Sequence, residues 1–222
     1  MRALIRFGKQ PRLRFISHLD LQRFFQRALN RTGLPIAFSQ GFNPHPVMSF
    51  ASALALNWTS EYEILDVKLT EPVCANHVEA VVRDALPGDL PVLEVRMVED
   101  RFPSLMSKVY ASEYRIEIGR EAAPALHVAA KEFLRRSSCM AVRKTKSGER
   151  QVDIRPLLLS LDPLDNGFHA RLMLTEQNTL KPDLFVRSLS DLACADTPTM
   201  AIHRIALLGQ GDSGQMKPLM EL

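Results

Sequence analysis

The stretch of sequence that decides the expected fold is RLRFISHLDLQRFFQRALNRTGLPIAFSQGFNPHPVMSF, residues 12–50. Ser17 and Asp20 have the spacing of a capping box with a short acid, so a helix is expected to begin at about His18. Apolar residues then recur with helical periodicity, and the predicted buried stripe is Leu21, Phe24, Phe25, Ala28 and Leu29. Gly33 and Pro35 are expected to end this helix near Arg31.

Outward from this helix, the first half of the chain alternates between strand-like and helical segments. Extended segments are expected at 3–9 and 12–17, separated by a turn, and at 47–56, 63–69 and 90–98. A second helix is expected at 75–86, before Pro87 and Gly88. The resulting order is strand, helix, strand, strand, helix, strand, which is that of a ferredoxin-like βαββαβ domain.

The second half repeats this order of elements. Helices are expected at 121–136 and 182–194, and strands at 110–118, 139–144, 151–161, 168–174 and 199–208, with a hairpin around the turn KSGE. The sequence therefore predicts an α+β protein of two tandem ferredoxin-like domains, each an antiparallel sheet with two helices on one face. The expected domains are residues 1–103 and 104–209, and residues 210–222 are expected to form a flexible tail.

Charge is separated by sign along the sequence. Residues 1–46 contain eight Arg or Lys and a single acid, Asp20, whereas residues 47–107 contain four basic and ten acidic side chains. The formal net charge of +3 therefore conceals a strongly basic N-terminal segment. A basic face on a domain of ordinary composition indicates a polyanionic partner, most often nucleic acid.

The predicted helix carries part of this charge in a regular row. Arg23, Arg27 and Arg31 recur every four residues, about 6 Å apart along the helix axis. No acidic residue alternates with them, and a row of unpaired guanidiniums suits successive phosphates. The alternative is a solvated helix face. The nucleic-acid-binding candidates in this region are Arg12, Arg14, Arg23, Arg27, Arg31 and, in the following loop, Asn43.

Two histidines lie near the two ends of the predicted helix. His18 at its N-terminus is expected to stay neutral because the helix dipole disfavours imidazolium, so it can act as a base or donate a hydrogen bond to phosphate. His45 lies in SQGFNPHP, residues 39–46, a loop stiffened by two prolines. The catalytic candidates are therefore His18, His45 and Asp20. The alternatives are a solvent-exposed His45, a His18 that caps a neighbouring strand, and an Asp20 that only caps the helix.

A second basic segment surrounds the predicted hairpin. Seven Arg or Lys lie between Arg135 and Arg155, against two acids, and the nucleic-acid-binding candidates among them are Arg143, Lys144, Lys146 and Arg150. No aromatic residue lies between Leu134 and Gly167, so phosphate and shape contacts rather than base stacking are expected there. The alternative is an exposed solubilising hairpin.

The composition excludes several classes of protein. Cys74, Cys139 and Cys194 are too dispersed for a disulfide framework, a metal knuckle or an iron–sulfur triplet, and each is expected to be a small buried residue. No HxxxH or HxH pair is present, so no metal site is expected, although His18, Asp20 and His45 could converge with one further ligand. No membrane span or apolar signal region is found, and a soluble cytoplasmic protein is expected.

The motifs HLDLQR and GFNPHP, with SEYEILDVKLTEP and VRKTKSGERQVDIRPLL, closely resemble the radical-SAM-linked proteins of unknown function. That family's domain stands alone or is fused behind a radical SAM protein, and its members often lie near genes for ribosomal proteins or ribonuclease. The resemblance implies a bacterial, cytoplasmic protein with a radical SAM partner that holds the iron–sulfur cluster and S-adenosylmethionine. After the arginine of the last expected strand, where the family has threonine–glutamate, this chain has Ile205–Ala206, which puts any role for an acid there in doubt.

Three functions fit these observations. The preferred one is a non-catalytic accessory protein that binds RNA and presents tRNA or rRNA to a radical SAM enzyme. The second is a metal-independent RNA endonuclease or phosphoryl-transfer enzyme that uses His18 and His45, with Arg12 or Arg23 stabilising charge. It is supported by an architectural similarity to CRISPR repeat-processing endonucleases, although fold does not fix function. The third is a protein-interaction subunit whose basic face docks on an acidic radical SAM partner.

Overall fold

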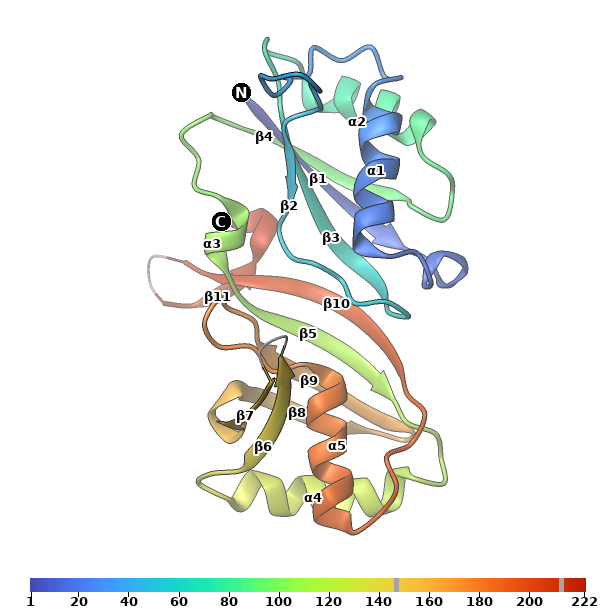
Figure 1. Ribbon diagram of the computed structural model, residues 1–222, viewed down its shortest axis with the longest axis vertical. Helices are drawn as coiled ribbons and strands as arrows, with labels where there is room; N and C mark the ends of the chain where they lie inside the picture. The colour runs from blue at the N-terminus through green and yellow to red at the C-terminus, as the bar shows by residue number, and fades with distance from the viewer. Residues whose placement is uncertain (146–147, 212–213) are drawn as a thin grey trace. The chain divides into compact units, whose positions relative to one another are not determined.

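The computed structural model describes residues 1–145, 148–211 and 214–222 and shows a mixed α+β protein (Figure 1). Its strands pair mostly antiparallel, and the described residues include five α-helices. The chain divides into two compact units. The first unit comprises Met1–Val109 and Ala206–Leu222, and the second comprises Tyr110–Ile205.

The first unit is built on a sheet covered by two main helices. Its elements are β1 (Arg2–Lys9), α1 (His18–Leu29), β2 (Met48–Phe50), β3 (Thr59–Lys68), α2 (Ala75–Ala85), β4 (Val92–Val98) and the short α3 (Leu105–Lys108). The strand order is β4-β1-β3-β2, and each of these pairs is antiparallel.

The core of the first unit joins the sheet to both helices. Ala3, Ile5 and Phe7 alternate along β1 and face the buried residues of α1 and α2, because alternate strand residues point to one side of a sheet. Phe7 lies 4.7 Å from Phe25 between ring centroids, and Phe25 lies 5.7 Å from Phe50. These aromatic contacts fix α1 against the strands.

The capping box that was predicted for α1 is confirmed. The Ser17 hydroxyl accepts a hydrogen bond from the backbone N–H of Asp20 at 3.2 Å and donates one to the Asp20 carboxylate at 2.6 Å. Leu21, Phe25, Ala28 and Leu29 are buried as expected, while Phe24 is partly buried. The helix ends at Leu29, two residues earlier than predicted.

The strand expected at 12–17 does not form. Residues Pro11–Leu13 form a 3-10 turn instead, and 14–17 lead directly into α1. Pro11 fixes its φ angle and provides no N–H, so this segment cannot extend the sheet from its first residue.

Residues near the C-terminus complete the first unit. Strand β11 (Met216–Pro218) pairs with the end of β10 (Ala201–Gln210), and a 3-10 turn follows at Leu219–Glu221. Leu219 and Met220 are buried, and the Met220 backbone accepts a bond from Arg96 at 2.7 Å and donates one to the Tyr62 hydroxyl at 3.2 Å. Residues 210–222 were expected to form a flexible tail, whereas Met216–Glu221 form a strand and a turn with buried apolar residues.

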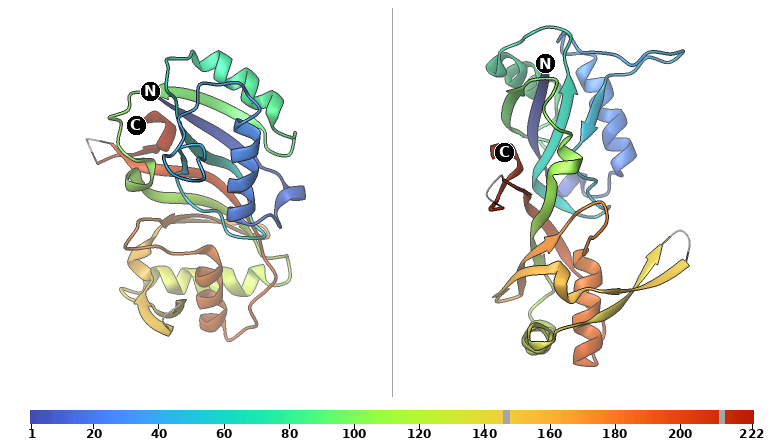
Figure 2. Two further views of the ribbon diagram at one scale, coloured as in Figure 1. Left: turned by 45° about the horizontal axis from the view of Figure 1, so that its top comes forward. Right: turned by 90° about the vertical axis from the view of Figure 1, so that its left-hand side faces the viewer.

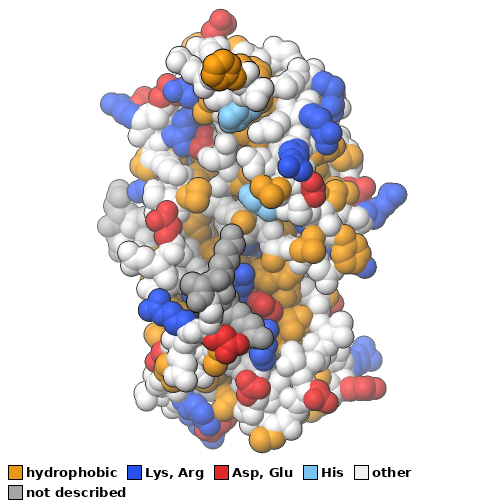
Figure 3. All heavy atoms as spheres, viewed as in Figure 1, with side chains coloured by type: hydrophobic (Ala, Val, Ile, Leu, Met, Phe, Trp, Pro, Cys, Tyr) orange, Lys and Arg blue, Asp and Glu red, His pale blue; other side chains and the backbone are white. Residues whose placement is uncertain are grey.

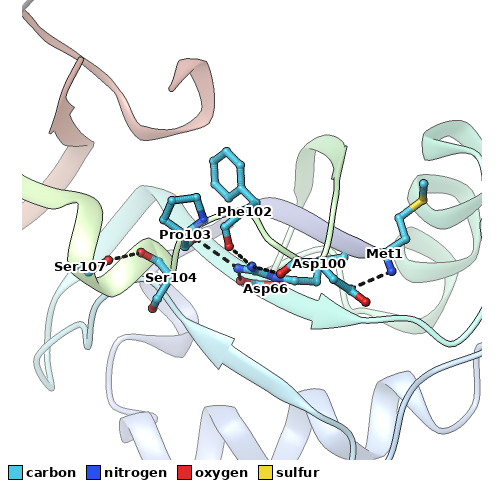
Figure 4. A network of polar contacts seen from close by, with 8 residues as sticks. Met1, Asp66, Asp100, Phe102, Pro103, Ser104 and Ser107 are labelled. Carbon is cyan, nitrogen blue, oxygen red and sulfur yellow. Dashed lines mark hydrogen bonds and ion pairs between the residues drawn. The ribbon is translucent and has the colours of Figure 1, made fainter. Parts of the chain in front are cut away.

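A network centred on Arg2 holds the segment after β4 (Figure 4). The Arg2 guanidinium forms a bidentate ion pair with Asp66 on β3 and donates to the carbonyl of Phe102. The Met1 ammonium lies 2.8 Å from Asp100 of the same segment. Hydrogen bonding to Asp66 raises the pKa of Arg2. The guanidinium is therefore always charged and keeps its ion pair with Asp66 and its bond to the segment after β4.

The second unit has its own antiparallel strands and two helices. Its elements are β5 (Val109–Glu117), α4 (Ala123–Arg135), β6 (Met140–Thr145), β7 (Gly148–Asp153), β8 (Leu158–Leu164), β9 (Gly167–Met173), α5 (Pro182–Ala193) and the first half of β10. Within this unit the strand order is β10-β5-β9-β8, with β5–β9 and β9–β8 antiparallel.

The hairpin of the second unit forms a separate two-stranded sheet, which Figure 2 shows extending away from α4 and α5. The single strand predicted for 151–161 is wrong, because β7 ends at Asp153 and β8 begins only at Leu158. The Asp153 carboxylate accepts from the backbone N–H of Cys139 at 2.8 Å and of Arg155 at 3.1 Å. These bonds fix the 3-10 turn Arg155–Leu157 that separates the two strands.

All three cysteines are free, as the sequence indicated. Cys139 is buried, but the prediction that Cys74 and Cys194 are buried is wrong, since both are exposed. They lie at helix ends, where Cys74 precedes α2 and Cys194 follows α5 with a positive φ of 50°.

Candidate nucleic-acid interface

Three of the eight basic side chains in residues 1–46 are used inside the first unit. Arg2 pairs with Asp66, Arg6 lies 3.0 Å from Glu94, and Lys9 is buried. The five that remain at the surface are Arg12, Arg14, Arg23, Arg27 and Arg31. These are the N-terminal arginines that the sequence indicated as nucleic-acid-binding candidates.

The arginines of α1 follow one another on the exposed side of the helix, where Figure 3 shows Lys and Arg side chains gathered. Arg23 lies 3.5 Å from Asp20, so the expectation that the whole row is unpaired is wrong at its first member. Both side chains are more than half exposed, and such a pair contributes little stability. Within the described residues, Arg27 and Arg31 form no ion pair, and Arg31 donates only to the Ala85 carbonyl at 3.3 Å.

The segment before α1 presents two arginines and an aromatic ring. Arg12 is 85% exposed and only 3.9 Å from Asp89, and Arg14 lies over the Phe15 ring at 4.6 Å from its centroid. Phe15 is itself 65% exposed. The segment therefore offers a cation–π pair to solvent at the N-terminal end of the arginine row.

A buried lysine that the sequence did not single out anchors this segment. Lys9 is 2% exposed, and its ammonium donates to the backbone carbonyls of Ile16 at 3.0 Å and Arg14 at 3.3 Å. Burial lowers the pKa of Lys9, and the nearby charge of buried Glu63 opposes this shift. The one indication in the sequence is that Lys9 follows Ala3, Ile5 and Phe7 at every second position of β1, so that its side chain points to the buried side of the strand.

The loop Ser39–Pro46 is closed at its base by polar contacts. The Ser39 N–H donates to the His45 carbonyl at 2.9 Å, and the His45 N–H donates to the Ser39 hydroxyl at 3.1 Å. The His45 imidazole Nδ1 lies 2.9 Å from the same hydroxyl and 3.3 Å from the Asn43 carbonyl. The backbone bridge between Phe38 and Pro46 completes the closure. Asn43 and His45 are exposed at its tip and edge.

The two candidate histidines lie in different surroundings. His18 is half-buried, with its ring 5.0 Å from that of Phe50, and its pKa is lowered mainly by burial. The charge of Lys9 lowers it further, while Glu63 raises it. A neutral His18 was predicted from the helix dipole, and in the structure burial of the imidazole lowers its pKa. Among the described residues, no hydrogen bond or shared partner joins His18 to His45.

Asp20, the third catalytic candidate, is engaged in the capping box and in the contact with Arg23. Its carboxylate is 62% exposed. Both contacts of the Asp20 carboxylate are with residues at the start of α1, Ser17 and Arg23.

In the second unit, the hairpin arginines differ in exposure. Arg143 on β6 is half-buried and donates to the Thr179 carbonyl, whereas Arg150, its cross-strand partner on β7, is exposed. Arg143 borders two cavities of about 210 and 390 Å³, one shared with Asp183 and Arg187 of α5 and the other with Arg150. The side chain of Lys144 and the whole of Lys146 lie outside the described residues.

Two searches of the described part of the chain were negative. No group of three His, Cys, Asp or Glu side chains is arranged to hold a metal ion there. Nor does any helix in that part have the length and apolar character needed to span a membrane.

The fold and the exposed arginines define an α+β protein with a candidate polyanion-binding face on its first unit. The chain belongs to a family of uncharacterized proteins conserved in bacteria, DUF2344, whose pattern matches residues 2–182. The match includes both α1 and the β6–β7 hairpin. No curated protein matches the chain. The family description assigns no reaction, cofactor or partner.

Proposed function

We propose that this protein is a cytoplasmic RNA-binding accessory protein, which presents tRNA or rRNA to a radical SAM enzyme. The observation that carries the proposal is the exposed row of Arg23, Arg27 and Arg31, of which only the first contacts an acid among the described residues. Successive guanidiniums on one helix face bind phosphates of a polynucleotide backbone without reading sequence.

The surroundings of the row support RNA rather than a small anion. Arg12 and Arg14 extend the positive surface beyond the N-terminal end of α1. Buried Lys9 fixes their segment by donating hydrogen bonds to its backbone carbonyls. Arg23 and Arg27 lie about 6 Å apart along α1, and Arg31 follows two residues beyond the last residue of the helix, so the row exceeds the size of a single phosphate. A partner with repeated negative charge fits this length better than one ion does.

The order of elements supports two tandem ferredoxin-like domains, which we propose as the architecture. The orders β4-β1-β3-β2 in the first unit and β10-β5-β9-β8 in the second both correspond to a βαββαβ chain path with antiparallel neighbours. In the second unit the β6–β7 hairpin is inserted between α4 and β8.

The association with a radical SAM enzyme rests on the sequence resemblance alone. In this proposal the iron–sulfur cluster and S-adenosylmethionine belong to the partner, and this chain supplies RNA binding. RNA cleavage by His18 and His45 is the weaker alternative, because their contacts involve different residues and different elements.

Filter binding of labelled tRNA and of rRNA fragments tests the RNA-binding role. The wild-type protein is expected to bind at micromolar concentration or better, with affinity that falls steeply as salt increases. The double variant Arg27→Gln and Arg31→Gln should lose about tenfold in affinity. Its plot of log affinity against log salt concentration should have a shallower slope, which corresponds to the loss of about two phosphate contacts.

The matched control is Arg120→Gln with Arg187→Gln, which removes two exposed arginines of the second unit. It should bind RNA nearly as the wild type does. Absence of salt-sensitive binding by the wild-type protein would contradict the proposal, and shortening of the RNA during incubation would favour the nuclease alternative.

A further inference from the structure

The phenylalanines of this chain divide sharply by exposure. Of the 11 in the sequence, only Phe15, Phe38 and Phe42 are exposed, at 65%, 48% and 106%. All three lie in the arginine-rich segment on either side of α1. Because burial of a phenylalanine is strongly favourable, this confined exposure indicates that the rings have a ligand.

The loop around Phe42 holds its ring away from the body of the first unit. The Ser39–His45 contacts and the Phe38–Pro46 bridge close the base of the loop, and Pro46 is buried. Gly41, with a φ of +136°, allows the turn that precedes Phe42. His45 therefore serves as a positioning residue for the loop tip.

At the other end of α1, Phe15 forms a stack with the Arg14 guanidinium. The turn Pro11–Leu13 lies near the start of α1, and the α1–β2 connection that contains Phe42 lies beyond its end (Figures 1 and 2). The arginine row thus runs between two sites with exposed aromatic rings. Aromatic and guanidinium planes both stack on nucleobases.

We propose that the first unit selects unpaired RNA, whose bases stack on Phe42 at one end of α1 and on the Arg14–Phe15 pair at the other. This inference rests on the proposed RNA-binding function and specifies its substrate class. Between the two sites, Arg23, Arg27 and Arg31 hold the connecting phosphates. Paired bases are already stacked within a helix and leave no face for these rings, so a duplex loses this part of the binding.

Fluorescence anisotropy with a labelled 12-nucleotide unstructured RNA, alone or annealed to its complement, tests the inference. The wild-type protein is expected to bind the single strand at least fivefold more tightly than the duplex. Phe42→Ala should weaken single-strand binding by roughly fivefold or more and leave duplex binding and the salt dependence unchanged. Phe42→Trp should keep the single-strand affinity, because it keeps a stacking ring.

Met106→Ala is the matched control, since Met106 is a half-exposed apolar residue of the first unit outside this region. It should bind both RNAs as the wild type does. Equal wild-type affinity for single strand and duplex, or single-strand binding by Phe42→Ala and Phe15→Ala at the wild-type level, would overturn the inference. The second result would assign the rings to a protein partner. Wild-type protein that binds neither RNA would instead refute the proposed function itself.

Discussion

The α1 face of the first unit and the β6–β7 hairpin of the second have similar charge in the sequence but use their arginines differently. Arg27 on α1 and Arg31 just beyond its end are exposed and have no ion pair among the described residues, and aromatic rings lie exposed near both ends of the helix. On the hairpin, Arg143 is half-buried and bonded to the Thr179 carbonyl, and Arg150 is the one exposed basic side chain among those that the structure describes there.

This difference shows that charge density alone does not identify a binding surface. A half-buried arginine that donates to a backbone carbonyl stabilises local structure, whereas an exposed arginine keeps most of its five donors for a ligand, even where one of them contacts a carbonyl as in Arg31. We therefore propose that RNA binds mainly to the first unit, and three measurements can contradict or refine this proposal.

The largest effect is expected at Lys9, which anchors the segment before α1. Lys9→Met removes both carbonyl contacts and the positive charge near buried Glu63, so the free energy of unfolding should fall by about 3 kcal/mol. Urea unfolding followed by circular dichroism measures the change. Arg12→Met, at an 85% exposed position, is the control and should change stability by less than about 0.5 kcal/mol. Equal stability of the two variants would mean that the ammonium does not anchor this segment.

An intermediate effect is expected in the hairpin. Arg143→Gln should lower the free energy of unfolding by about 1 kcal/mol because it removes the bond to Thr179, while Arg150→Gln should leave it unchanged. Both variants should keep RNA affinity within about threefold of the wild type, since each removes at most one phosphate contact. If Arg150→Gln weakened RNA binding as much as the α1 double variant, the two regions would have to be treated as one interface.

The smallest effect is expected at His18, whose burial should make the free energy of unfolding depend on pH. A pKa lowered in the folded state means that the unfolded chain binds the proton more readily, so stability falls as pH decreases below about 6.5. Between pH 7.5 and 5.5 the wild type should lose more stability than His18→Gln, by less than about 1 kcal/mol. Parallel pH profiles of the two proteins would show that Glu63 offsets the burial of the imidazole and the charge of Lys9.

The sequence predicted the features that depend on local interactions. The capping box of α1 involves residues only three positions apart, and the buried stripe follows from helical periodicity. Both features could therefore be predicted from one short segment. The hairpin was also predicted, and β6 pairs with β7 across the turn. Helix boundaries were correct to within about two residues because Gly, Pro and cap residues mark them.

Features that depend on the folded arrangement of irregular segments could not be predicted from the sequence. The break between β7 and β8 depends on Asp153 accepting the N–H of Cys139, 14 residues away in sequence. The burial of Lys9 requires the carbonyls of Arg14 and Ile16, which come from an irregular segment whose course is not set by a repeating pattern in the sequence. The sequence did not indicate the exposure of Phe42, because phenylalanine is ordinarily a buried residue.

The first unit is discontinuous in sequence, since it needs Met220 to bond Arg96 and Tyr62. During synthesis, its early residues leave the ribosome well before this closing segment is made. The buried cluster around α1 uses residues 3–97 alone, whereas the contacts of Met220 can form only after the second unit has been translated. The second unit is continuous and can fold as it emerges. The first unit should thus be the last to be completed, although most of it is translated first.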